Sequence, residues 1–155
     1  MAGEGCIFCR IARGEAPAQI IWEDEQTMAF LDIAPVARGH TLVIPRRHYR
    51  DLMSVPDEEL AAVMATAKRV ARALMEGLGA TGVNVLHASG VAAGQSVFHF
   101  HLHLIPRREG DGLDPWPEEG YQGREREREQ EDDPEEVCKR IRVALALQGP
   151  KRYLN

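Results

Sequence analysis

The segment from Phe98 to Ile105 alternates apolar residues with histidines and reads Phe-His-Phe-His-Leu-His-Leu-Ile. Side chains along a β-strand point to opposite faces in turn, so His99, His101 and His103 would share one face and the apolar side chains the other. Half of the six histidines of the chain stand in this row. The pattern predicts a strand that packs one face on a core and carries functional histidines on the other.

Hydrophobic periodicity elsewhere predicts an α+β fold with an antiparallel sheet of about five strands. Short runs rich in β-branched or aromatic residues, bounded by turn residues, predict strands at Ile20–Glu23, Thr27–Asp32, Thr41–Ile44, Gly82–His87 and Val97–Ile105. A long helix from Pro56 to Leu78 should cover this sheet. Its predicted apolar stripe is Leu60, Val63, Met64, Ala67, Val70, Ala71, Leu74 and Leu78.

The composition changes after Pro106. Residues 107–142 hold 8 basic and 13 acidic side chains, which accounts for the whole net charge of −5. A final helix should start at Pro134 and dock on the domain or on a partner chain. We therefore divide the chain into a domain at residues 1–110 and a charged extension with a terminal helix at 111–155. The predicted apolar side of the terminal helix is Val137, Ile141, Val143, Ala144 and Leu147, with Cys138 as a buried small side chain.

Several partners are excluded by composition. No apolar run approaches the roughly 20 residues that cross a membrane, and the acidic N-terminus lacks the pattern of a secretory signal. The chain outside the extension is balanced in charge, without the basic stripe that a nucleic-acid backbone needs. We expect a cytoplasmic protein that binds neither membrane nor nucleic acid.

Two kinds of chemistry could use the histidine row. Neighbouring imidazoles could converge on a catalytic metal ion, as in a metal-dependent hydrolase. Alternatively, one histidine is a nucleophile that its neighbours orient. Gly94, Gln95 and Ser96 precede the row and offer backbone N–H groups, an amide and a hydroxyl. Because such groups bind anions, they favour the nucleophile.

These residues resemble the histidine triad (HIT) signature, and the chain is similar to the bacterial Hint-type branch of that family over about residues 5–106. The resemblance implies the HIT fold. It also implies a homodimer in which the helix Pro56–Leu78 and the sheet edges meet. The matching segments are 94–106, Cys6–Ile11, Phe30–Ile33 and Gly39–Pro45 with His48.

The family implies a specific activity. HIT proteins bind a nucleotide, usually adenosine, and cleave its α-phosphate from an amine, a phosphate or an acyl group. By resemblance His101 is the nucleophile, which forms a nucleotidyl-histidine that water hydrolyses to release AMP. His99 and His103 complete the catalytic row. The implied nucleotide contacts are Asp32 for the ribose, Phe8, Phe30, Leu31 and Ile33 for the base, and Gly94, Gln95, Ser96, Val97 and His103 for the phosphate.

The leading hypothesis is therefore a purine nucleoside phosphoramidase or nucleotidyl hydrolase. Alternatives are a dinucleoside polyphosphate hydrolase, the metal-dependent hydrolase, and a nucleotide-binding protein without turnover. One departure bears on the leaving group: Hint-like proteins usually carry an asparagine facing the phosphate where this chain reads Ala88-Ser89-Gly90. Either Ser89 substitutes for it, or the phosphate is held less tightly. His40 should join a hydrogen-bond relay near the triad, and no role is predicted for His87.

Cys6 and Cys9 form a C-x-x-C pair. A redox motif would open a helix after a strand, and no strand is predicted before Cys6. A tetrahedral zinc site needs two more ligands, with free thiols as the alternative. In zinc-bearing bacterial HIT proteins the other ligands are histidines, and the resemblance implies His48 and His99. We expect structural zinc and no organic cofactor.

Overall fold

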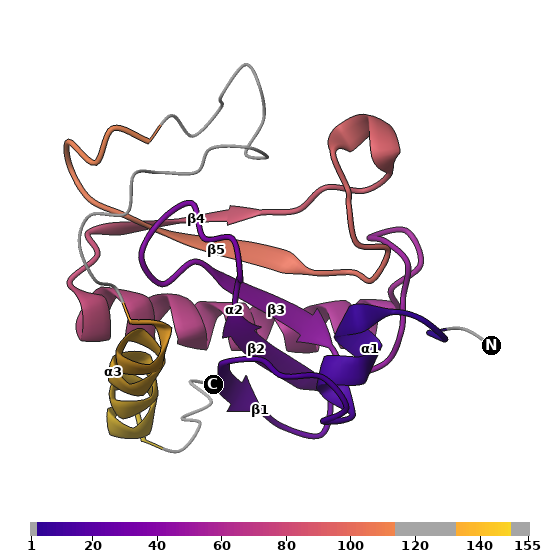
Figure 1. Cartoon of the computed structure of the whole chain (residues 1–155), viewed down its shortest axis with the longest axis horizontal. Helices are drawn as coiled ribbons and strands as arrows, with labels where there is room; N and C mark the ends of the chain where they lie inside the picture. Colours follow the sequence, from indigo (N-terminus) through magenta and orange to yellow (C-terminus); the bar gives the residue numbers. More distant parts are fainter. Residues whose placement is uncertain (1–2, 114–132, 150–155) are drawn as a thin grey trace.

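The computed structural model describes residues 3–113 and 133–149. One antiparallel sheet has the strand order β1-β2-β3-β5-β4, with α2 behind it and α1 in front (Figure 1). The α+β architecture, the five strands and both long helices are confirmed. The elements are α1 (Ile7–Ala12), β1 (Ile20–Glu23), β2 (Thr27–Leu31), β3 (Thr41–Pro45), α2 (Asp57–Leu78), β4 (Gly82–Leu86), η1 (Val91–Ala93), β5 (Leu102–Arg107) and α3 (Pro134–Leu147).

The central strands β2 and β3 are buried along their whole length. Ala29 and Leu31 pack in the core beneath α2 and α3, whereas Met28 and Phe30 pack in a second core beneath α1. Alternate side chains therefore serve two cores. Coverage of both faces explains why these strands are almost continuously apolar.

Helix α2 buries a face slightly different from the predicted stripe. Thr66 and Ala73 are buried, whereas Met64 is 48% exposed. The helix ends at Gly79, whose φ of 68° gives the left-handed cap that glycine adopts without strain. Within residues 3–113 and 133–149, no helix is long and apolar enough to cross a membrane.

Helix α3 packs on α2 and β1. A Cβ at Gly77 of α2 would lie 2.8 Å from the carbonyl oxygen of Arg140, so a glycine there permits the close approach. The predicted apolar side was partly wrong: Val143 and Leu147 are exposed, and Leu145 is buried instead. Val143 lies about 200° around the helix from the buried Ile141, which turns it to solvent. Cys138 is buried, as predicted.

Strand β5 is shorter at its start than the predicted Val97–Ile105. It begins at Leu102, because the backbone before it bonds to loops: the Phe100 N–H donates to the Tyr49 carbonyl at 2.6 Å. The alternation of faces nevertheless continues through this segment. Phe100, Leu102 and Leu104 lie in the α2-side core, and the histidines face α1.

Candidate active site and metal centre

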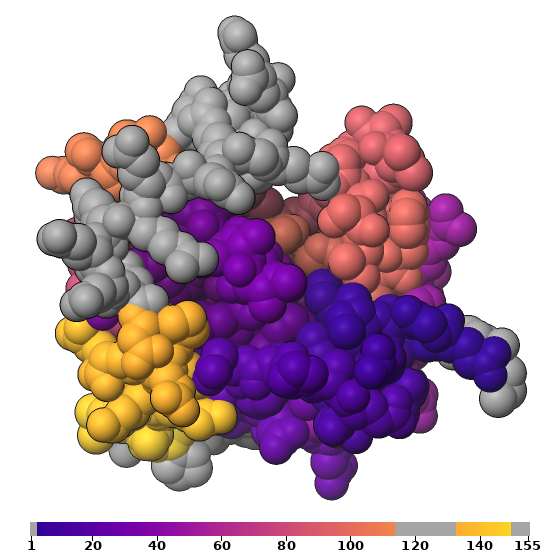
Figure 2. Space-filling model, in the orientation of Figure 1, coloured from indigo at the N-terminus to yellow at the C-terminus, as the bar shows by residue number. Residues whose placement is uncertain are grey.

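The histidine row lies beneath α1. The ring of Phe8 in α1 meets His101 edge-on at 5.2 Å between centroids and His99 at 5.9 Å. Figure 2 shows the α1 segment, in indigo, directly against the salmon segment that follows β4. Phe30 packs on the same ring, with 5.4 Å between the centroids of Phe8 and Phe30. The site is thus walled by the smaller core of the domain.

His101 is held in one tautomer. Its Nδ1 lies 2.6 Å from the carbonyl oxygen of His99. A carbonyl oxygen can only accept, so Nδ1 carries the hydrogen and Nε2 of the neutral ring presents a lone pair. Burial lowers the pKa of His101, which favours this neutral form. The arrangement is that of an oriented nitrogen nucleophile.

A second chain of hydrogen bonds orients His103. The Val36 N–H donates to Nδ1 of His40 at 3.2 Å, so the hydrogen of His40 is on Nε2. That group donates to Nδ1 of His103 at 2.9 Å. Nε2 of His103 therefore carries a hydrogen and can donate to a ligand. Burial, with repulsion from neighbouring histidines, lowers the pKa of His103 to about 3 and keeps it neutral.

The two rings meet edge to face, with 4.9 Å between the centroids of His101 and His103. One ring offers a lone pair and its neighbour an N–H donor. This pairing suits attack on an electrophile whose oxygen atoms gain negative charge. The relay expected for His40 is therefore present as hydrogen-bond geometry.

The predicted nucleotide contacts fall into different environments. Phe8 and Phe30 are on the side of the histidine row, and Ile33 is 96% exposed just beyond β2. Leu31 packs in the α2-side core, away from that row. Asp32 accepts from the Ala34 N–H at 2.8 Å through Oδ1, while Oδ2 lies 3.7 Å from Nε2 of His40. Asp32 thus brings a carboxylate next to the relay.

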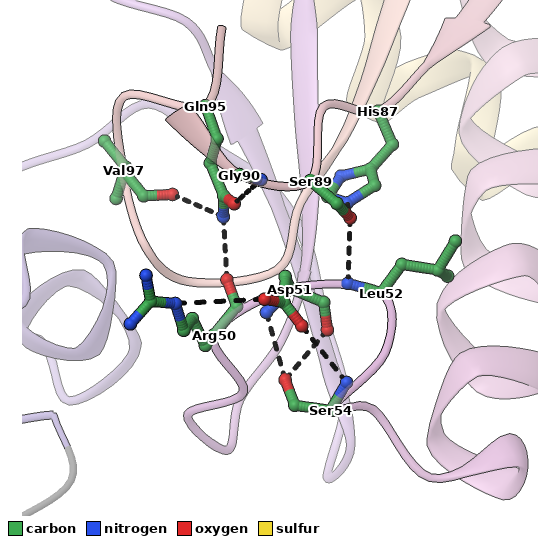
Figure 3. A network of polar contacts seen from close by, with 9 residues as sticks. All are labelled: Arg50, Asp51, Leu52, Ser54, His87, Ser89, Gly90, Gln95 and Val97. Atoms are coloured by element: carbon green, nitrogen blue, oxygen red, sulfur yellow. Dashed lines mark hydrogen bonds and ion pairs between the residues drawn. The ribbon is translucent and has the colours of Figure 1, made fainter. Parts of the chain in front are cut away.

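The loop before the row is built around Gln95 (Figure 3). The buried Gln95 amide donates to the carbonyls of Arg50, at 2.7 Å, and Val97, at 3.1 Å, and its Oε1 accepts from the Gly90 N–H. Both the nitrogen and the oxygen of this amide, which was expected among the phosphate-binding groups, are therefore hydrogen-bonded to the main chain. Ser96, the next residue, is exposed.

Cys6, Cys9, His48 and His99 form the predicted cluster, with ligand atoms within 4.8 Å of one another. The Cys9 sulfur lies 3.3 Å from Nδ1 of His48 and 3.5 Å from Nδ1 of His99, and Cys6 lies 3.6 Å from the latter. Tetrahedral zinc bonds of about 2.3 Å to sulfur and 2.0 Å to nitrogen place a sulfur and a nitrogen ligand roughly 3.5 Å apart. The residues fit a zinc ion.

Protonation at the cluster agrees with that fit. Nε2 of His99 donates to the Pro45 carbonyl at 2.9 Å, which leaves the Nδ1 lone pair facing the sulfurs. Burial, with the neighbouring Cys6, raises the pKa of Cys9 to about 11, so a cation is required to hold it as the thiolate. Binding of a divalent ion would release that proton.

The geometry does not support a metal shared by the whole row. Nδ1 of His99 faces the cysteines and its Nε2 donates to the Pro45 carbonyl, so both ring nitrogens of His99 are engaged elsewhere. Asp32, His40 and His103 also have close ligand atoms, but Nδ1 of His40 accepts from Val36, so its Nε2 carries a hydrogen and not a lone pair. The oriented nucleophile explains the row better than a catalytic metal.

The sequence predicted no role for His87, which the structure places beside His101. Nδ1 of His87 lies 2.9 Å from the His101 carbonyl oxygen, and Nε2 lies 2.7 Å from Oγ of Ser89. The Ser89 hydroxyl also accepts from the Leu52 N–H at 3.2 Å. A signal was available: the histidine directly follows β4, whose Leu86 pairs with His103.

Comparison with known proteins agrees with this architecture. A family model described as the HIT domain matches residues 13–110. The chain belongs to the histidine triad (HIT) family.

Solved structures and curated relatives include close matches. A zinc-bound histidine triad family protein from Mycobacterium smegmatis superposes with a TM-score of 0.81, at 44% identity, covering 94% of this chain and 96% of that one. A hypothetical histidine triad nucleotide-binding protein from Sulfolobus tokodaii gives a TM-score of 0.77 at 34% identity, covering 92% of this chain and 93% of that one. An adenylylsulfatase of Arabidopsis thaliana is 40% identical over 70% of this chain and 55% of its own length.

Proposed function

We propose that this protein is a nucleotidyl hydrolase that releases AMP from adenosine conjugates through His101. The observation that carries the proposal is the hydrogen bond from Nδ1 of His101 to the His99 carbonyl, which leaves Nε2 unprotonated. Membership of the HIT family and the named adenylylsulfatase relative support this reaction class. A buried neutral histidine with a fixed tautomer suits covalent catalysis.

In the proposed reaction Nε2 of His101 forms a bond to the α-phosphorus as the bond to the leaving group breaks. The leaving group departs with the bonding electron pair and takes up a proton. His103 donates from Nε2 to a phosphoryl oxygen. Water then breaks the Nε2–phosphorus bond, which releases AMP and restores His101.

Most of the substrate contacts inferred from the family are kept in this proposal. Asp32 holds the ribose, Phe8, Phe30 and Ile33 contact the base, and Gly94, Ser96, Val97 and His103 contact the phosphate. Leu31 and the Gln95 side chain are left out, because Leu31 packs in the α2-side core and the Gln95 amide is hydrogen-bonded within the protein. Cys6, Cys9, His48 and His99 would hold zinc, which supplies structural cross-linking between α1 and the histidine row.

The assembly is also part of the proposal. We infer a homodimer through α2 and the edge strand β4, where Met64 and Val85 are 48% and 45% exposed. Light scattering at micromolar concentration should give the mass of two chains, and a monomer mass would contradict this. We keep residues 1–110 as the catalytic domain and 111–155 as an extension.

A panel of substrates tests the activity. Adenosine 5′-phosphoramidate, a dinucleoside polyphosphate and adenylyl sulfate are each incubated with the protein, and AMP is measured. Release of AMP from at least one, abolished in His101→Gln, is expected. The rates identify the leaving group. AMP binding without turnover of any of the three would favour a binding protein.

A further inference from the structure

The main chain around His101 is held from outside the sheet. Ladder pairing of β5 begins at Leu102, opposite Val43, so the residues just before it are not in register with a strand. Two contacts replace that pairing: the Phe100 N–H donates to the Tyr49 carbonyl, and the His101 carbonyl lies 2.9 Å from Nδ1 of His87. The His87 side chain thus contacts the main-chain carbonyl of His101, the proposed nucleophile.

The hydrogen bonds around His87 run in one direction. The His101 carbonyl can only accept, so Nδ1 of His87 donates, and Nε2 of the neutral ring must accept from the Ser89 hydroxyl. The Ser89 oxygen in turn accepts from the Leu52 N–H. Each polar atom of this chain has a partner of the correct kind, and Ser89 thereby fixes the tautomer of His87.

The hydrogen-bond chain through His87 and Ser89 ends on the same segment that holds the loop around Gln95. Segment 49–52 accepts from the Phe100 N–H through Tyr49. The same segment accepts from the Gln95 amide through Arg50 and donates to Ser89 through Leu52 (Figure 3). The ring of His87 also packs on Phe100, with 4.6 Å between centroids, and Phe100 is completely buried. His87 is therefore located by packing on one side and by hydrogen bonds on the other.

We propose that His87 is a positioning residue for the nucleophile: it fixes the main chain of His101 so that Nδ1 stays on the His99 carbonyl and Nε2 faces the substrate. The inference rests on the proposed function and deepens it. His101 is then fixed at two points: its ring by the His99 carbonyl and its main-chain carbonyl by Nδ1 of His87. Ser89 serves this chain and not the phosphate.

Substitutions at His87 separate positioning from folding. His87→Asn places an amide nitrogen near the position of Nδ1 and keeps a donor, whereas His87→Leu removes it. Val83→Ala, on strand β4 just before His87 and partly buried against the core, is a matched control for lost packing. All variants are assayed well below their unfolding temperatures.

The first readout is the single-turnover rate of adenylyl transfer to His101 and the KM for the substrate. We expect His87→Leu to slow the transfer about 10- to 100-fold, as a small misplacement of a reacting group does, with KM changed less than about twofold. His87→Asn should recover most of the rate, and Val83→Ala should keep it. A wild-type rate in His87→Leu, or an equal loss in Val83→Ala, overturns the proposal.

The second readout does not depend on turnover. Nitrogen-15 spectra of labelled imidazoles report which ring nitrogen of His101 is protonated, and His87→Leu should lose the pure Nδ1–H pattern of the wild type. An unchanged pattern in His87→Leu overturns the positioning role. If the wild type turns over no adenosine conjugate, the proposed function fails, and these spectra still decide whether His87 positions His101.

Discussion

Nδ1 of His101 lies 2.6 Å from the carbonyl oxygen of His99, while the side chain of that same His99 faces the sulfurs of Cys6 and Cys9. One residue therefore belongs to both centres, through its imidazole in the cluster and through its main chain at the nucleophile. A displacement of His99 would move the acceptor that fixes the tautomer of His101. In the proposed reaction the cluster would therefore be coupled to the chemistry through His99, although it does not contact the reacting atoms.

Loss of the metal-binding cluster should lower the free energy of unfolding and slow the release of AMP. Cys9→Ala is expected to bind no zinc and to unfold about 10 °C lower, the shift that a few kcal/mol produce in a chain of this size. AMP release should fall with it. Metal analysis and thermal unfolding make the measurement, with Cys138→Ala as control, because Cys138 is buried against the Ile20 carbonyl outside the cluster. Full zinc content in Cys9→Ala would refute the site.

The relay predicts a graded effect at His40. His40→Ala removes the donor to Nδ1 of His103, so the hydrogen of His103 is no longer directed to its Nε2, and kcat should fall about 10- to 100-fold. His40→Gln can place an amide donor near the position of Nε2 and should recover part of the rate. Steady-state kinetics distinguish the two. Equal kcat in the wild type and His40→Ala would remove the relay from the mechanism.

Asp32 should act on binding more than on rate. A hydrogen bond to a charged group contributes about 1.5–3 kcal/mol, so Asp32→Ala should weaken AMP binding roughly 10- to 100-fold. Calorimetric titration of AMP measures the change, and the single-turnover rate at saturating substrate serves as the comparison. Unchanged affinity would mean that the ribose binds elsewhere.

Stability should fall in acid because of His103. Burial lowers its pKa to about 3 from the ordinary 6.5, so between these values the unfolded chain binds more protons than the folded one. The free energy of unfolding therefore rises with pH through this window and is level above it, and at pH 5.5 the deficit from this group is about 1.4 kcal/mol. Urea unfolding from pH 7.5 to 5.5 measures the slope.

The matched variant for this slope is His103→Gln. It removes one titrating group while the rest of the protein, including the metal ligands, is the same in both chains. Its unfolding free energy should depend less on pH by the same amount. Parallel curves for the two proteins would contradict the assignment.

Alternation in the sequence was sufficient to predict which face each residue of the row occupies. Phe100, Leu102 and Leu104 are in the core and the histidines opposite, because the pattern follows from backbone geometry alone. The start of β5 was not predictable, since it depends on Tyr49 and His87, which are distant in sequence. Partners of buried polar atoms are likewise set by tertiary structure, which is why the chain from Leu52 through Ser89 and His87 was not predicted.

The zinc ligands and the contact of His40 with His103, in contrast, were predicted from the family resemblance. The C-x-x-C spacing suggested a metal, but only the family resemblance pointed to His48 and His99, 39 and 90 residues from Cys9. The exposed Val143 and Leu147 show what helical periodicity leaves undetermined. Apolar residues at helical spacing do not indicate which face of the helix packs on its neighbour.

The central claim is that Nε2 of His101 attacks phosphorus, and trapping the intermediate tests it most directly. The protein is mixed with adenosine 5′-phosphoramidate, quenched without acid because phosphohistidine is acid-labile, digested, and mapped by peptide mass. The account predicts an adenylyl group on His101 that is absent from His101→Gln and disappears as AMP forms. Rapid AMP release with the adenylyl group on another residue, or with none on His101 at any time, would contradict it.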